Sequence, residues 1–135
     1  MSSYLNIYIQ PKQENVEPIK LISYSRNSKV YQAFYEDIHP TYIGDDEIKY
    51  TDLSIDDIDR ALYSLNESIN NTSKRLNEYE KHASGNTEII DSIIELKEYL
   101  EELKETSNTI NVIRRLVEGA SYNLTGFSKV MCNID

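Results

Sequence analysis

Hydrophobic side chains recur every three or four residues through two long stretches in the second half of the chain. Spacing that alternates between three and four places these side chains along one seam of a helix, as in a coiled coil. The pattern therefore predicts two long amphipathic helices, over about 54–84 and 87–118. Their seam positions are Ile55, Ile58, Leu62, Leu65, Ile69, Thr72, Leu76, Tyr79 and Ala83 in the first, and Ile89, Ile93, Leu96, Leu100, Leu103, Ser107 and Ile110 in the second.

Capping residues stand at the ends of these two patterns. Ser54, with an aspartate three residues later, approximates a capping box at the start of the first helix. Gly85 and Asn86 supply a stop signal followed by a start signal. A connection this short requires the helices to lie side by side and antiparallel. Residues 106–109 (Thr-Ser-Asn-Thr) are weak helix formers, so we expect the second helix to bend or break there, and Gly119 to end it.

The first fifty residues have a mixed pattern. The segments 4–9 and 19–24 have the alternation or β-rich composition of two strands, which a polar loop joins into a hairpin. Helical spacing follows over 28–37, where Pro40 limits its extension. We further expect a short third strand over 47–51.

A last strand over 129–134 could return to the amino-terminal sheet. The sequence as a whole predicts one α+β domain that is mostly helical. Its parts are a small mixed region over 1–53, an antiparallel helical hairpin over 54–118, and a tail over 119–135.

The charge balance narrows the class of partner. Among 135 residues, 23 acidic against 14 basic side chains give a formal net charge of -9. Nucleic-acid-binding modules normally carry a basic surface, and docking on anionic lipid needs Lys and Arg, so we expect neither direct nucleic acid nor membrane as a partner. The chain shows no signal-peptide pattern and a single cysteine, Cys132, which indicates a reducing, cytoplasmic compartment. Richness in Asn, Ile, Lys and Tyr suggests an AT-rich genome, such as that of a low-GC bacterium or its phage; a phage protein would act in the host cytoplasm.

Motifs for catalysis, cofactors and metals are absent. The four glycines are too scattered for a phosphate-binding loop, and no paired-histidine or CxxC motif occurs. Asp52, Ser54 and Asp56 have the spacing of the first ligands of an EF-hand, but Asp57 replaces its glycine and Tyr63 its final glutamate. We therefore predict a non-enzymatic protein with no cofactor and no metal. A looser divalent-metal site stays open as an alternative, among Asp45, Asp46, Glu47, Asp52 and Asp56.

Two surface features are candidate partner contacts. On the second predicted helix, six carboxylates recur at steps of three and four and form an acidic stripe away from the seam. The simplest interpretation of such a stripe is a solvated outer face; the alternative is a contact surface for a basic protein. Tyrosine is also abundant, and the two tyrosines of the first strand lie opposite its aliphatic face. The candidate contacts are Glu88, Asp91, Glu95, Glu98, Glu102 and Glu105 of the stripe, Asp45, Asp46 and Glu47 of an acidic loop, and Tyr4 and Tyr8.

Two functions fit these observations. The first is a non-enzymatic interaction or assembly protein that uses the helical hairpin to bind itself or another protein. The second is an acidic phage or mobile-element inhibitor that imitates nucleic acid and blocks a basic nucleic-acid-binding host protein, such as a defence effector.

Overall fold

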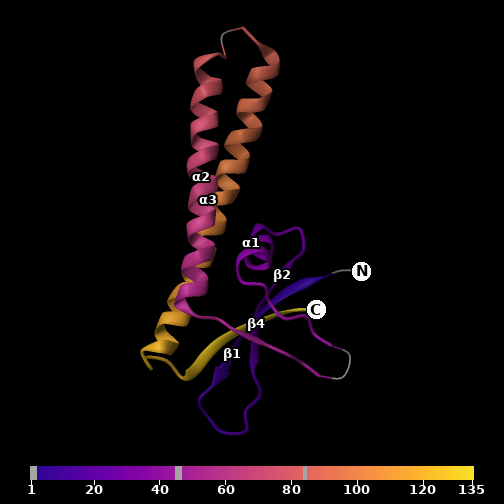
Figure 1. The fold of residues 1–135 in the computed structure, drawn as a ribbon, viewed down its shortest axis with the longest axis vertical. Helices are drawn as coiled ribbons and strands as arrows, with labels where there is room; N and C mark the ends of the chain where they lie inside the picture. The colour runs from indigo at the N-terminus through magenta and orange to yellow at the C-terminus, as the bar shows by residue number, and fades with distance from the viewer. Residues whose placement is uncertain (1–2, 45–46, 84) are drawn as a thin grey trace.

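A four-stranded antiparallel sheet, one short helix and one long helical hairpin make up the protein (Figure 1). The computed structural model describes residues 3–44, 47–83 and 85–135. The strand order is β2-β1-β4-β3, so the last strand lies between the first and the third. This arrangement confirms the predicted α+β, mostly helical fold. The elements are β1 (Tyr4–Pro11), β2 (Ile19–Ser25), α1 (Lys29–Asp37), β3 (Thr51–Asp52), α2 (Ile55–Lys81), α3 (Thr87–Ser121) and β4 (Phe127–Ile134).

Side-chain caps begin all three helices. The Ser28 side chain accepts a hydrogen bond from the Val30 backbone N–H, and Ser54 accepts one from the N–H of Asp57 at 3.1 Å. Asn86 accepts from the N–H groups of the next helical turn. These bonds satisfy backbone donors that have no partner within the helix. Asn86 confirms the predicted start signal, whereas α2 ends at Lys81 with His82 as its C-cap, before the expected residue 84. Gly85, with φ of 76°, therefore lies in the connection, in the left-handed conformation that glycine tolerates best, and is not the C′ residue of α2.

The predicted break in the second helix is wrong, because α3 runs unbroken through residues 106–109. The hydroxyls of Thr106 and Thr109 donate to backbone carbonyls one turn earlier, at 2.8 and 3.1 Å. Thr106 is buried, and the turns that follow carry Ile110 and Ile113 into the core. Burial of each such side chain contributes about 1.5–3 kcal/mol, which exceeds the helix-propensity loss of at most about 0.7 kcal/mol per weak former.

Two further boundaries differ from expectation. Gly119 does not end α3, which continues to Ser121; the Thr125 methyl would lie 3.0 Å from a β-carbon at position 119, so this glycine leaves room for the returning chain. The third strand covers only Thr51–Asp52 rather than 47–51. The Lys49 carbonyl accepts a hydrogen bond from the Asn133 side chain instead of continuing the ladder.

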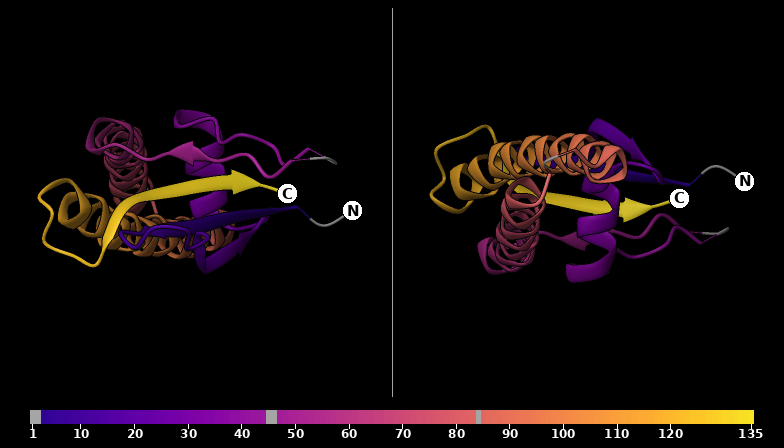
Figure 2. Two further views of the ribbon diagram at one scale, coloured as in Figure 1. Left: turned by 90° about the horizontal axis from the view of Figure 1, so that it is seen from below. Right: turned by 90° about the horizontal axis from the view of Figure 1, so that it is seen from above.

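The main core lies between one face of the sheet and the helices. Figure 2 shows α1 and the lower part of the hairpin on the same side of the sheet. The buried side chains come from every layer: Leu5, Ile7, Val130, Cys132 and Ile134 from the sheet, Phe34 from α1, Ile58 and Ala61 from α2, and Ile110, Ile113 and Val117 from α3. Because the core uses the proximal turns of α2 and α3, the distal turns project away from the body (Figure 1).

The opposite face of the sheet holds a buried polar network. Asn6 and Asn133 are 1% and 0% exposed, and the Asn6 side-chain amide donates to the Asn133 Oδ1 at 3.1 Å. Ser23 donates to the Asn6 Oδ1 at 2.6 Å, and the Asn133 amide reaches the Lys49 carbonyl at 3.0 Å. The segment before β3 therefore covers this face, and β4 is buried on both sides.

Candidate functional site

The acidic stripe is solvent-exposed along α3. All six of its carboxylates are exposed, and none forms an ion pair with another residue in the described part of the chain. Lys97, which could offset the stripe, instead lies 3.7 Å from Glu80 on α2. Like charges at these helical spacings disfavour the helix by about 0.2–0.5 kcal/mol per pair. The stripe thus concentrates negative charge that the protein leaves without a counter-ion of its own.

Only the distal part of this stripe stands clear of the body. Glu102 and Glu105 line a small pocket with Ser28 and Lys29 at the start of α1. The Lys29 ammonium lies 5.3 Å from the centre of the Tyr99 ring, on the same side of α3. The carboxylates from Glu88 to Glu98 precede this contact and belong to the projecting turns.

The other predicted contact residues do not join the stripe. Glu47 is exposed in the segment before β3, on the sheet side of the molecule, and Asp45 and Asp46 lie outside the described residues. Tyr4 is 39% exposed, whereas Tyr8 is partly buried. Its ring meets the Tyr50 ring edge-on, with centroids 5.0 Å apart. The predicted contact set is therefore divided between two regions.

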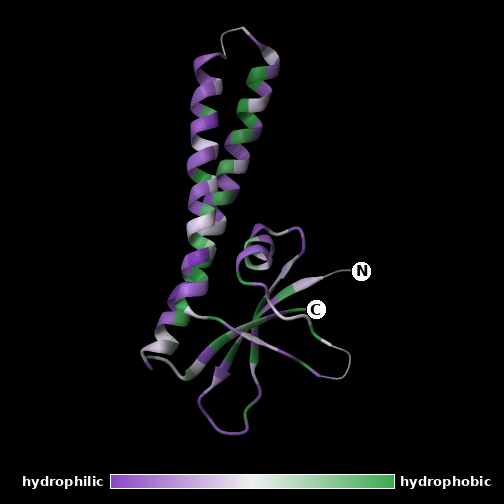
Figure 3. Ribbon diagram, viewed as in Figure 1, coloured by the Kyte–Doolittle hydropathy of each residue, from purple (hydrophilic) through white to green (hydrophobic). Residues whose placement is uncertain are grey.

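A strip of isoleucines lies beside the distal stripe. Ile90 and Ile94 are 45% and 51% exposed, and Ile89, Ile93 and Leu96 of the seam are only partly buried. At 100° per residue, Ile90 and Ile94 fall between the seam and the acidic stripe, on the side of α3 opposite to Tyr99. Since Tyr99 faces α1, these isoleucines face away from the body. Figure 3 shows the apolar turns of α3 continuing into the projecting half of the hairpin.

A surface pocket of about 660 Å³ lies beside α1. Tyr31 and Tyr35, one helical turn apart, stack with ring centroids 6.3 Å apart and planes inclined by 10°. Tyr42 completes the aromatic lining, and Ser3 lies 3.0 Å from the Tyr31 hydroxyl. The remaining lining residues are Arg26, Asn27, Gln32, Glu36 and Asp135.

Backbone contacts fix the parts of this pocket that come from different elements. The Arg26 N–H donates to the Ser3 carbonyl at 3.1 Å, which ties the end of β2 to the start of β1. After α1, His39 adopts a φ of 55° and the chain reverses. Residues 41–43 then pair with Ile134 at the end of β4, and this bridge positions Tyr42.

The Tyr42 hydroxyl of the pocket stays neutral at physiological pH, because its pKa is raised. Burial raises the pKa of the Tyr42 phenol, and the neighbouring Tyr31 and Tyr35 hydroxyls raise it further. Arg26 and Glu36 are exposed at the rim, and neither forms an ion pair among the described residues. Sequence reasoning missed this pocket, although the density of tyrosine before residue 50 and the helical spacing of Tyr31 and Tyr35 were available signals.

The thiol of Cys132 lies in the core. Burial raises the pKa of the Cys132 thiol to about 12, so it stays protonated. Within residues 3–44, 47–83 and 85–135, no cluster of three or more His, Cys, Asp or Glu side chains is arranged to hold a metal ion. None of the helices in the described ranges is both long and apolar enough to cross a membrane.

Comparison with known proteins gives no relative: no family model, curated protein or solved structure matches this chain.

Proposed function

We propose that this chain is a non-enzymatic protein–protein interaction module that binds its partner through the distal turns of the α2–α3 hairpin. The observation that carries the proposal is the exposure of Ile90 and Ile94 on a part of the hairpin that the body does not cover. Residues 70–81 of α2 follow Ile69, the last residue of this helix that packs against the main core, and at 1.5 Å per residue they span about 18 Å. An exposed apolar strip on a projecting helix pair is typical of an interaction site.

The charge beside this strip favours a basic protein as the partner over a second copy of the chain. Glu88, Asp91, Glu95 and Glu98 lie beside the isoleucines and form no ion pair with any residue that the structure describes, and the whole chain carries a formal net charge of -9. If two copies of the chain met at this strip, their carboxylates would repel one another. A partner protein whose groove has an apolar floor and a rim of Lys or Arg would complement both the isoleucines and the carboxylates. The proposed site of action is the cytoplasm.

A matched set of exposed variants tests this proposal. The double variant Ile90→Ser/Ile94→Ser should lose the partner in a tagged pull-down from host-type lysate. Val112→Ser is the control, because Val112 is 56% exposed and lies 18 residues, or five full turns, after Ile94 on the same helix face, beside the body. If the Ile90→Ser/Ile94→Ser variant still captures the partner, the distal strip is not the contact surface.

The acidic inhibitor is a second candidate, which the exposed and unpaired distal carboxylates support. Carboxylates about 5 Å apart along a helix form a row of negative charge, as the phosphates of a nucleic-acid backbone do. The variant Glu95→Gln/Glu98→Gln should then weaken capture more than Ile90→Ser/Ile94→Ser does, and high salt should release the partner. A salt-resistant complex that tolerates both Gln substitutions would reject this candidate and leave the apolar contact.

A further inference from the structure

We propose that the tyrosine-lined pocket beside α1 binds an organic cation, either an ammonium or a guanidinium group. This site lies off the distal hairpin, so the inference goes beyond the proposed function and does not depend on it. The same cationic chemistry occurs in a free amine and in a Lys or Arg side chain of a peptide.

The size and walls of the pocket suit a small organic group. Its volume of about 660 Å³ falls within the range of about 300–1,000 Å³ that is common for small-molecule sites. Tyr35 and Tyr42 are 49% and 55% exposed, so parts of both rings remain open to a ligand. Tyr31 is 6% exposed, stacks on Tyr35 and is near Ser3, which gives the wall a fixed backing.

The charges around the pocket favour a cation over an anion. Its lining includes the acidic residues Glu36 and Asp135 and the basic residue Arg26. The Asp135 side-chain carboxylate accepts hydrogen bonds from the Tyr4 N–H at 3.0 Å and the Asn6 amide at 3.3 Å, so it adds negative charge near the pocket while Glu36 is the acidic side chain available to a ligand. Among the described residues that line the pocket, Arg26 is the one basic side chain with which an anion could pair, in a chain whose formal net charge is -9.

The tyrosine rings of the pocket also attract a positively charged ligand. The face of an aromatic ring is negative, so a cation placed over it is attracted, and pockets lined by several aromatic rings recognise quaternary ammonium groups in this way. The hydroxyls of the three tyrosines and the amides of Asn27 and Gln32 supply acceptors for the N–H groups of a guanidinium. Rings, acceptors and charge thus favour the same class of ligand.

The experiment is an NMR titration of the full chain with tetramethylammonium, methylguanidinium and, as the matched anion, methyl phosphate. We expect saturable shifts of the Tyr35 and Tyr42 ring signals with both cations and none with methyl phosphate. Short neutral-ended peptides with one Arg or one Lys identify the source: tighter binding than methylguanidinium indicates a protein side chain, and equal or weaker binding indicates a free amine.

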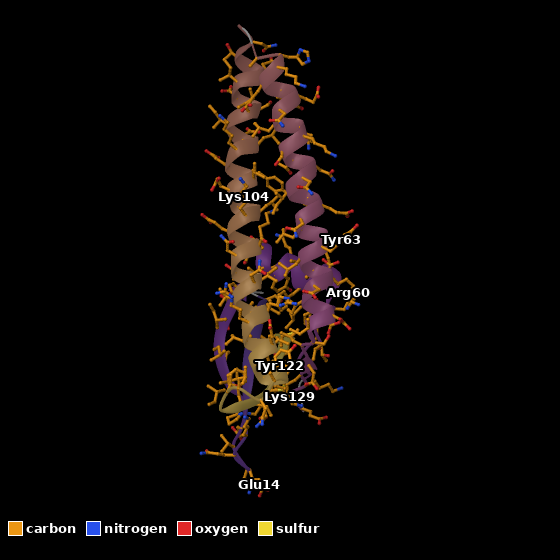
Figure 4. The ribbon with its side chains drawn as sticks, turned by 90° about the vertical axis from the view of Figure 1, so that its left-hand side faces the viewer. Glu14, Arg60, Tyr63, Lys104, Tyr122 and Lys129 are labelled. Atoms are coloured by element: carbon orange, nitrogen blue, oxygen red, sulfur yellow. The ribbon has the colours of Figure 1, made fainter. Side chains whose placement is uncertain are left out.

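Four variants at exposed side chains, one of them a control, test whether the pocket prefers a cation to an anion. Glu36→Gln should weaken cation binding about two- to fivefold, and Arg26→Gln should strengthen it by a similar factor. Tyr42→Leu should weaken it about two- to fivefold through loss of one aromatic wall. Tyr63→Leu is the matched control, because Tyr63 is 67% exposed on α2 (Figure 4) and does not line the pocket.

The opposite pattern would overturn the inference. Saturable binding of methyl phosphate that Arg26→Gln abolishes would assign the pocket to an anion. Shifts that stay linear with both cations up to their solubility limit would show that the pocket has no cationic ligand of this class. Neither result touches the hairpin variants, so failure here and failure of the proposed function remain distinguishable.

Discussion

The Asn6–Asn133 pair should be a major source of stability in the sheet, and this can be measured by a double-mutant cycle. Asn133 is fully buried, accepts from the Asn6 amide at 3.1 Å and donates to the Lys49 carbonyl at 3.0 Å. Asn133→Ala removes both bonds at once. It leaves the Lys49 carbonyl without this donor, and the Asn6 amide keeps only its longer bond of 3.3 Å to Asp135.

The magnitude follows from the groups left without partners. Each buried polar group that loses its hydrogen bond costs about 1–3 kcal/mol, so we expect Asn133→Ala to lower the free energy of unfolding by about 3 kcal/mol. Asn6→Ala leaves the Asn133 Oδ1 without its donor, whereas Ser23 is exposed, so its hydroxyl can bond to water instead. We therefore expect this variant to lower the free energy of unfolding by about 2 kcal/mol. In the double variant neither amide remains to lack a partner. The double variant should therefore lower the free energy of unfolding by about 1 kcal/mol less than the sum of the two single variants.

Urea unfolding followed by far-UV circular dichroism provides the assay. Asn111→Ala is the control, because the Asn111 side chain is exposed on α3 and should change stability by less than about 0.5 kcal/mol. If the two single variants and the double variant are additive within about 0.3 kcal/mol, the two amides do not interact and the reasoning is refuted.

Three further predictions concern the hairpin and the core. Gly85→Ala should lower the free energy of unfolding by about 1 kcal/mol in the same assay, because Gly85 has a φ of 76°; Gly126→Ala, without that constraint, should have little effect, and equal effects would contradict the argument. The Arg114 guanidinium, 2.7 Å from Asp59, holds the pKa of that carboxyl below its ordinary value of 3.8. The stabilisation is therefore complete above pH 3.8 and is lost as pH falls through the lower native pKa, so the stability difference between the protein and Asp59→Asn should vanish in acid; a difference that persists there would reject the pair as its cause. Cys132, 0% exposed and with its pKa raised to about 12, should resist Ellman's reagent in the native state and react in denaturant; rapid native reaction would mean that the core opens.

Local patterns in the sequence were enough for most of the elements. Ser28, Ser54 and Asn86 begin helices where their capping preference indicates, and Gly85 joins α2 to α3 as an antiparallel pair. Caps, helical periodicity and turns depend on interactions within a few residues, so they can be read directly from the chain. The exposed stripe on α3 was predictable for the same reason, because helix geometry alone sets which carboxylates share a face.

Long-range packing decided what the sequence could not. Weak helix formers predict a break in α3, but the burial of Thr106, Ile110 and Ile113 against distant elements keeps it continuous. Alternation places Asn6 with the outward tyrosines of β1, yet it is buried because the segment before β3 returns over that face. The pocket, likewise, unites residues from β1, α1, the loop after α1 and the end of β4.

These features share a physical cause. Each depends on which segments meet in the folded chain, and that choice follows from the burial and hydrogen bonding of the whole molecule. Asn6 and Asn133, which are 127 positions apart, are the clearest case. The sequence by itself therefore determined the helices, their caps and the acidic face. The tertiary structure alone decided the strand order, the buried amide pair, the uncovered isoleucines of the hairpin and the tyrosine pocket.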